Sequence, residues 1–296
     1  MTGSTVRGDA DGGTEVSPVQ GQINAPSVLI AQGFGADAPP LGLAAALPLR
    51  GGGSRVRDRL MSELGFHWQA ELRGVVERAV ARSRAVGADW LTIPPLLLCG
   101  PTGVGRTHVA RRIAEMAGLP HVGIAVGGSS GIEQLRPSSC GPDLLLPSAP
   151  VLAMAVSRCA NPAVSVFGVE ALDAHGQAEL ARMIDPATAE RWVDYACGAT
   201  VDLRHVNWMV QAHEPAALVP SLLRLLQPVW LRFPEGADAP LHLAEILAEA
   251  AIDLGVIDRV GSRASDGVEH LSRLRGELST ARIYAAARQW LDSQFG

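Results

Sequence analysis

The chain has 296 residues and contains no lysine, so that all 25 of its strongly basic residues are arginines. The absence of lysine excludes a Schiff-base lysine, a serine–lysine dyad and a phosphate-binding loop of the usual lysine-bearing type. Acidic residues outnumber basic ones, and the net charge is −5. A chain without a basic stripe cannot neutralise a phosphate backbone, and we therefore expect no nucleic-acid partner.

Cysteine and long apolar runs are scarce as well. No pair of cysteines has Cys-x-x-Cys spacing, and none clusters with histidine, which predicts no metal site. So few thiols suit a reducing cytoplasm. No apolar run reaches the roughly 18 to 20 residues of a membrane span, and the first 13 residues lack the apolar stretch of a signal peptide. We therefore expect a cytoplasmic protein without membrane contact. The four cysteines are Cys99, Cys140, Cys159 and Cys197.

Composition and periodicity divide the chain into four parts. Residues 1–54 are rich in glycine, alanine, proline and serine, which predicts a mostly disordered tail; the short apolar run 27–31 could dock somewhere, but the composition favours disorder there too. Residues 55–88 repeat apolar side chains every three or four positions and are expected to form leading helices. Beyond Pro240 the pattern is helical throughout, which predicts a small helical lid over residues 240–294.

Residues 89–235 alternate short apolar runs with helical patterns. Strands separated by helices form a parallel sheet. We therefore expect an α/β fold, with an αβα core followed by the helical lid. The expected strands are 93–99, 122–126, 163–167, 206–210 and 229–232, and the expected helices 108–117, 151–159 and 177–184.

A phosphate-loop pattern joins the first strand of this core to its first helix. Its glycines would let backbone N–H groups surround a phosphate at a helix N-terminus, and its final threonine would bind magnesium. Lysine of the usual pattern is replaced by Arg106, which keeps the charge but is a wide planar group, so that weak nucleotide binding is expected. A glycine-rich turn without a ligand is the alternative. The loop reads Gly100, Pro101, Thr102, Gly103, Val104, Gly105, Arg106 and Thr107.

Several segments together resemble the ATPase module of Lon-type AAA+ proteins, and most closely the stand-alone bacterial members that lack a protease domain. The resemblance covers about residues 56–292. It implies an αβα P-loop core, a helical lid and subunits that form a ring. The segments that carry it are 96–117, 124–128, Asn161-Pro162, Asp185-Pro186, Asp202-Leu203 and 206–208.

The two adjacent acids that this family uses to hold magnesium and activate water are not preserved. Aligned without gaps from Asn161-Pro162, they fall on Phe167 and Gly168. A shift by two residues places them on Val169 and Glu170, which preserves only the second acid. Glu170 is therefore either an ordinary polar residue at a strand end or a surviving acid, and magnesium binding is in doubt.

Other positions of the resemblance are also altered. The polar sensor corresponds to His213, which is either a substitute sensor or an exposed loop histidine. The arginine that would reach a neighbouring subunit corresponds to Leu225, with Arg224 one position earlier. Arg282 matches the second sensor, or is a solvated helix arginine, and completes the set of residues expected to contact nucleotide. No aromatic residue lies between Trp90 and Phe167, so that an aromatic pore-loop residue is absent.

These departures favour a pseudo-ATPase that binds ATP or ADP weakly, has largely lost hydrolysis, and acts as a scaffold or regulatory subunit in a homo- or hetero-oligomeric ring. A coding bias toward arginine would explain Arg106 alone. The alternative is an active ATPase that remodels proteins, with Arg106 on the phosphates, Glu170 on water and Arg224 acting in trans. A Lon-type protease is excluded because its serine–lysine pair needs lysine.

Overall fold

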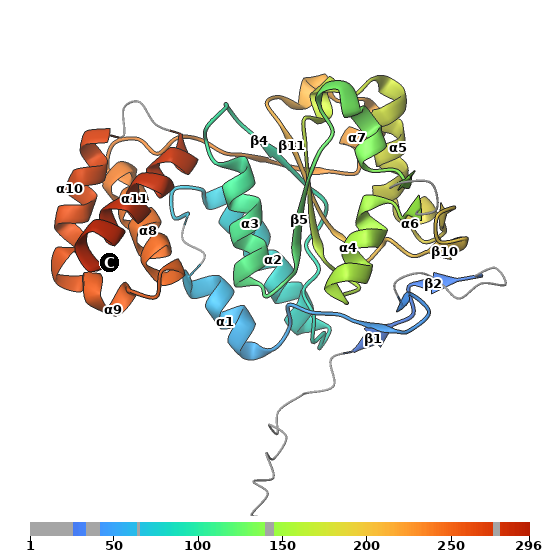
Figure 1. Ribbon diagram of the computed structural model, residues 1–296, viewed down its shortest axis with the longest axis horizontal. Coiled ribbons are helices and arrows are strands. Elements are labelled where there is room, and N and C mark those ends of the chain that lie inside the picture. Colours follow the sequence, from blue (N-terminus) through green and yellow to red (C-terminus); the bar gives the residue numbers. More distant parts are fainter. Residues whose placement is uncertain (1–25, 34–41, 64–65, 140–144, 275–278) are drawn as a thin grey trace, which may run out of the picture.

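The computed structural model describes residues 26–33, 42–63, 66–139, 145–274 and 279–296. Its centre is a five-stranded parallel sheet in the order β12-β4-β11-β8-β5 (Figure 1). Every one of the five expected strands is present. Their bounds are Leu96–Cys99 for β4, His121–Ala125 for β5, Ala163–Phe167 for β8, Asn207–Ala212 for β11 and Gln227–Trp230 for β12.

The register of the sheet aligns the carboxyl ends of its three middle strands. Ala212 at the end of β11 is paired with Cys99 at the end of β4. Gln211 of β11 is paired with Phe167 at the end of β8. The loops that follow β4, β8 and β11 therefore leave the sheet side by side, along one edge.

Helices cover both faces of the sheet because its strands are apolar on both sides, as parallel strands usually are. All four residues of β4 are fully buried. Leu96 and Leu98 pack toward α1, α2 and α3, whereas Leu97 and Cys99 pack toward α4 and α5. The expected αβα core is thus confirmed. These helices are Ser54–Glu63 (α1), Ala70–Ala85 (α2), Arg106–Met116 (α3), Ala149–Ser157 (α4) and Ala174–Ile184 (α5).

Shorter elements fill the connections, and sequence periodicity predicted none of them because two to seven residues carry no measurable repeat. Strands β9 and β10 form an antiparallel pair, and β6 pairs with β7. The bounds are Ser138–Ser139 (β6), Leu145–Leu146 (β7), Trp192–Asp194 (β9), Ala199–Val201 (β10), Pro186–Ala189 (α6), Pro220–Leu223 (α7) and, for 3-10 turns, Gly128–Gln134 (η2), Val169–Ala171 (η3) and Pro215–Ala217 (η4).

Part of the N-terminal segment, which the sequence predicted to be a mostly disordered tail over residues 1–54, is folded. Strands β1 (Ser27–Val28) and β3 (Leu47–Pro48) pair with each other, and β2 (Ala31–Gln32) adds to β10. The apolar side chains spaced between its glycines and prolines are buried in the same core as α4 and α5. Residues 1–25 and 34–41 lie outside the described residues. The buried side chains are Ile30, Ala31, Leu43, Leu47 and Leu49.

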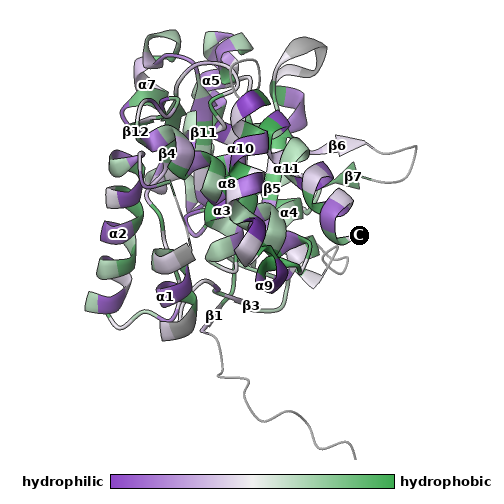
Figure 2. Ribbon diagram, turned by 90° about the vertical axis from the view of Figure 1, so that its left-hand side faces the viewer, coloured by the Kyte–Doolittle hydropathy of each residue, from purple (hydrophilic) through white to green (hydrophobic). Residues whose placement is uncertain are grey.

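The C-terminal helices form a separate small body with its own apolar core, as expected for a lid. It lies beside α3 and at a distance from α4 and α5 (Figure 1). Figure 2 presents this side of the molecule, with the lid helices α8 and α11 in front of α3. None of the helices in the described part of the chain is both long and apolar enough to cross a bilayer. The lid comprises Asp238–Asp253 (α8), Ile257–Val260 (α9), the 3-10 turn Gly261–Arg263 (η5), Ala264–Leu274 (α10) and Thr280–Phe295 (α11).

Candidate functional site

The phosphate-loop pattern folds as the tight turn between β4 and α3, and two of its glycines are required by that shape. Gly100 has a φ of 140°, and a Cβ there would lie 2.5 Å from the carbonyl oxygen of Leu231. Gly105 has a φ of 99°, and a Cβ there would lie 3.1 Å from the side chain of Thr280. Only glycine adopts such conformations without strain while allowing this close approach.

The loop presents unpaired backbone donors at the start of α3. Within the described part of the chain, no backbone or side-chain atom accepts a hydrogen bond from the N–H groups of five residues there. Unpaired N–H groups at a helix N-terminus carry partial positive charge and attract anions. The five residues are Gly103, Gly105, Arg106, Thr107 and His108.

The side chain of Arg106 does not extend along this row of N–H groups. Its Nη1 donates hydrogen bonds to the carbonyl oxygens of Gly100 and of Ala212, the latter at 2.7 Å, and its Nη2 lies 3.4 Å from Nε2 of His213. Burial lowers the pKa of Arg106, and the negative charge of Glu170 partly offsets this effect. The guanidinium therefore ties the loop to the end of β11.

The hydroxyl of Thr107, the expected magnesium ligand, is also engaged within the protein. It donates to Oε1 of Gln211 at 2.9 Å, and Gln211 is 4% exposed. An uncharged amide thus stands beside the threonine. The described residues contain no group of three or more histidine, cysteine, aspartate or glutamate side chains that could hold a metal ion.

The positions predicted for the two family acids hold no carboxylate. The ring of Phe167 lies 3.4 Å from the position of a Cβ on Gly123 of β5. Gly168 has a φ of 83°, and a Cβ there would lie 2.9 Å from the backbone nitrogen of Gly127. In the shifted alignment the first acid would fall on Val169, which is fully buried in the apolar core.

Three polar side chains meet at the loop in a continuous hydrogen-bonded row. Nε2 of His213 lies 2.7 Å from the hydroxyl oxygen of Thr102, and Nδ1 of His213 lies 2.7 Å from Oε2 of Glu170. Oε1 of Glu170 accepts from the backbone N–H groups of His213 and Glu214. Burial alone would raise the pKa of Glu170, but the hydrogen bonds from His213 and Glu214 lower it, which favours the carboxylate.

The lid touches the loop from the other side. The N–H of Thr280 donates to the carbonyl oxygen of Gly103 at 3.0 Å, and Ser279 lies 3.0 Å from the position of a Cβ on Gly103. Arg282 follows on α11, is exposed, and has no partner among the described residues. The lid thus brings the start of α11, which carries Arg282, to the loop, and no hydrogen bond or ion pair joins Arg282 to a described residue there.

Arg224 and Leu225, the two candidates for the arginine that would act in trans, have different surroundings. Arg224 is exposed and lies 4.0 Å from Asp185 of its own chain. Leu225 is half-buried and packs on the main core.

Sequence reasoning named Thr102, Glu170 and His213 separately but missed that they meet. The available signal was topological. Each residue follows a predicted strand of one parallel sheet, and the carboxyl ends of such strands share an edge. Whether the side chains also come within hydrogen-bonding distance depends on the conformation of the turn after β8. That conformation could not be predicted from the sequence.

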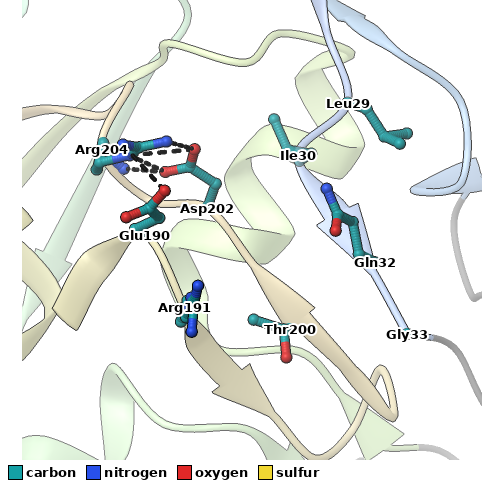
Figure 3. Close-up of a pocket in the computed structure, with 9 residues that line it drawn as sticks. All are labelled: Leu29, Ile30, Gln32, Gly33, Glu190, Arg191, Thr200, Asp202 and Arg204. Carbon is teal, nitrogen blue, oxygen red and sulfur yellow. Dashed lines mark hydrogen bonds and ion pairs between the residues drawn. The ribbon is translucent and has the colours of Figure 1, made fainter. Parts of the chain in front are cut away.

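A hollow of about 470 Å³, away from the loop, is lined by residues of the paired strands β2 and β10 and of the chain beside them (Figure 3). Its charged groups are largely paired with one another. Arg204 donates to both carboxylate oxygens of Asp202 and lies 3.3 Å from Glu190. The ion pairs hold the chain after β10 in place, beside the docked N-terminal segment.

Comparisons with known proteins identify relatives over part of the chain. Lon protease 2 of Thermus thermophilus is 29% identical over 166 residues, which are 51% of this chain and 20% of that protein. Lon protease 1 of Sorangium cellulosum is 26% identical over 181 residues, or 58% of this chain and 21% of that protein. The Lon protease of Mycolicibacterium smegmatis is 28% identical over 180 residues, which are 60% of this chain and 22% of that protein.

The chain therefore spans about a fifth of the length of the curated relatives it matches. No protein-family model matches it. Among solved structures, a mutant of Thermotoga maritima RuvB aligns with a TM-score of 0.43 and 14% identity, over 76% of this chain and 70% of that one. A TM-score of this size is too low to support an argument about function.

Proposed function

Since the chain carries a Lon-like AAA+ module, we propose that it is a pseudo-ATPase, which binds ATP or ADP weakly and has largely lost the ability to hydrolyse it. The observation that carries this proposal is the position of Arg106. Its guanidinium is bonded to the carbonyl oxygens of Gly100 and Ala212, where it holds the loop together. A side chain in that position cannot also bridge the outer phosphates of a nucleotide.

The remaining catalytic positions support the same proposal. Thr107 is bonded to Gln211, and the acid positions hold Phe167 and Gly168. Phosphoryl transfer depends almost entirely on placing the nucleotide and on stabilising charge. Each lost electrostatic contact of this kind typically costs about 10²-fold in rate, although such losses are not additive. Loss of the magnesium ligands and of the phosphate cation together leaves negligible turnover.

The unpaired N–H groups at the start of α3 support retained, weak nucleotide binding. In this proposal they hold the phosphates, together with residues 100–107, and Arg282 of the lid contributes from α11. Binding of this kind depends on backbone dipoles and needs no metal. The affinity for ATP or ADP is then nearly independent of magnesium.

The role that remains for such a module is mechanical or regulatory. We propose that it acts through protein contacts, as a scaffold or as a regulatory subunit of a homo- or hetero-oligomeric ring in the cytoplasm. The named relatives are Lon proteases, and the chain matches only about a fifth of each. The unmatched parts of those proteins carry no implication for this one.

Calorimetric titration with ATP, with and without magnesium, tests the proposal. We expect weak binding of equal strength in both conditions. The variant Arg106→Ala tests the position of the guanidinium, and we expect its affinity to stay within about threefold of the wild type, or less than about 0.7 kcal/mol. Binding that tightens strongly with magnesium would contradict the proposal.

Measurement of ATP turnover separates the proposal from the alternative of an active ATPase. In that alternative Glu170 activates water and Arg224 acts in trans, so that Glu170→Gln and Arg224→Ala would each abolish a measurable rate. We expect no measurable ATP turnover in the wild type or in either variant. A wild-type rate above background that both variants remove would establish the active ATPase.

A further inference from the structure

The row of Thr102, His213 and Glu170 has the connectivity of a nucleophilic triad. The Glu170 carboxylate faces Nδ1 of His213 at 2.7 Å, which places the ring proton on Nδ1. Nε2 then carries a lone pair, and the Thr102 hydroxyl stands 2.7 Å from it. A hydroxyl, a histidine base and an orienting carboxylate in this order are recognised by geometry and roles, and not by their order in the chain.

The topology around the triad also suits a nucleophile. Thr102 lies in a strand–turn–helix between β4 and α3, while Glu170 and His213 follow the adjacent strands β8 and β11. Thr102 is exposed, and about half of the His213 side chain is accessible, so that a substrate can reach both from solvent. Acyl-transfer enzymes with a sharp strand-to-helix turn place their nucleophile in the same kind of position.

The donors needed to stabilise an oxyanion lie next to the hydroxyl. The N–H of Gly103, the residue after Thr102, donates to no described atom, and neither do the N–H groups at the start of α3. Backbone N–H groups fixed in this way stabilise the negative charge that develops on a carbonyl oxygen under attack. The loop therefore combines an activated hydroxyl with a preformed group of donors, without the need for a metal.

We propose that Thr102 is an acyl-accepting nucleophile, activated by His213 and Glu170, that reacts with carboxylic esters. Oγ1 of Thr102 attacks the ester carbonyl carbon, and its proton passes to Nε2 of His213. The bond to the alcohol oxygen breaks, and that oxygen takes the proton from His213. Water, deprotonated in turn by His213, then releases the acyl group as a carboxylic acid and restores Thr102.

This activity goes beyond the proposed pseudo-ATPase role and does not depend on it, because no step involves a nucleotide. The two share only the loop. A failed acylation leaves the nucleotide titration unaffected, and a failed titration leaves the acylation unaffected. The two proposals are therefore tested separately.

The absence of lysine reduces the background acylation in the experiment that tests this proposal. Lysine side chains are the usual sites of background acylation, and this chain has none. The full chain is incubated with p-nitrophenyl acetate, p-nitrophenolate release is followed, and the acetyl group is located by mass spectrometry of the intact protein and its peptides. We expect an acetyl group on Thr102, in addition to any on the N-terminal amine.

Four variants test the triad. We expect Thr102→Val to abolish the Thr102 adduct, and Thr102→Ser to keep it, because serine retains the hydroxyl. Glu170→Gln keeps an oxygen for the two backbone donors but presents an amide N–H to Nδ1, which moves the ring proton to Nε2. We expect it to slow acylation about 10²- to 10⁴-fold, the usual contribution of a general base. Thr200→Val, a threonine of β10, is the matched control and leaves the rate unchanged.

Thermal unfolding of each variant shows whether the fold is retained, and the acylation rates of folded variants are compared. Residual p-nitrophenolate release in Thr102→Val measures the background from the histidines. A release rate in Thr102→Val equal to that of the wild type overturns the proposal. So does a wild-type adduct found only on the N-terminus or on residues other than Thr102, or a Glu170→Gln variant that acylates at the wild-type rate.

Discussion

Arg106 and Thr107 are neighbours in the sequence, yet both turn toward the end of β11 and find partners there. Arg106 bonds to the carbonyl of Ala212, and Thr107 bonds to the amide of Gln211. These two side chains, both expected to meet a nucleotide, are thus hydrogen-bonded within the protein itself. At the residue scale, the departures from the Lon-like pattern form a consistent set of internal contacts.

Gly168 provides a residue-scale prediction. A Cβ there would meet the backbone nitrogen of Gly127 at 2.9 Å, in a backbone conformation that already disfavours side chains. We expect Gly168→Ala to lower the free energy of unfolding by about 3 kcal/mol, measured by urea denaturation. Gly236 has a φ of 50° with no atom within 4 Å, so that Gly236→Ala isolates the conformational cost, about 1 kcal/mol. Equal losses in the two variants would contradict this account.

At the scale of elements, the docking of the N-terminal segment depends on one buried amide. Oδ1 of Asn161 accepts from the N–H of Arg50 at 2.7 Å, and its Nδ2 donates to the carbonyl oxygens of Arg50 and Leu91. Asn207 donates in turn to the carbonyl oxygen of Asn161. Asn161 and Asn207, which the sequence analysis noted only as part of the family resemblance, thus link residues 42–54 to the sheet by hydrogen bonds.

We expect Asn161→Leu to lower the free energy of unfolding by about 3 kcal/mol, because it leaves backbone groups of Arg50 and Leu91 unpaired in the interior. The N-terminal segment should also become more accessible to trypsin at Arg50, which limited proteolysis with peptide mapping would detect. The control is Gln294→Leu, which alters an amide on the last helix and should not change cleavage at Arg50. Unchanged cleavage in Asn161→Leu would show that the apolar contacts alone hold the segment.

At the scale of the whole molecule, the lid is fixed to the core through α3, the helix that begins at the phosphate loop. Glu249 of α8 is 6% exposed. Its carboxylate lies 2.9 Å from Nε2 of His108 and accepts a hydrogen bond from Arg111 at 3.1 Å. Arg112, which is 3% exposed, lies 3.8 Å away. Buried charges thus contribute to the position of the lid on the core.

Removal of that shared anion should loosen the lid. We expect Glu249→Gln to lower the free energy of unfolding by about 3 kcal/mol, because it removes the buried carboxylate that Arg111 and Arg112 share and leaves them only the more exposed Glu115 and Asp253. Glu269→Gln, which breaks an exposed ion pair with Arg273 on α10, should change it by less than about 1 kcal/mol. Urea denaturation measures both, and small-angle scattering would report an opened lid. Similar values for the two variants would show that apolar contacts fix the lid.

The sequence by itself determined the α/β class, the five strands of the sheet, the phosphate-loop turn and the helical lid. These features depend on local patterns, because buried strands and amphipathic helices repeat within a few residues. It also predicted which family side chains are missing, since Phe167 and Gly168, with which the family acids align, carry no carboxylate in any fold.

Only the tertiary structure decided what replaces the missing groups. The meeting of Thr102, Glu170 and His213, the inward turn of Arg106 and the docking of residues 26–33 and 42–54 all join segments that are distant in sequence. Such contacts depend on strand order, register and the course of intervening loops. Composition alone predicted disorder for the N-terminal segment, because it cannot show that the core leaves an apolar surface for a few spaced side chains to cover.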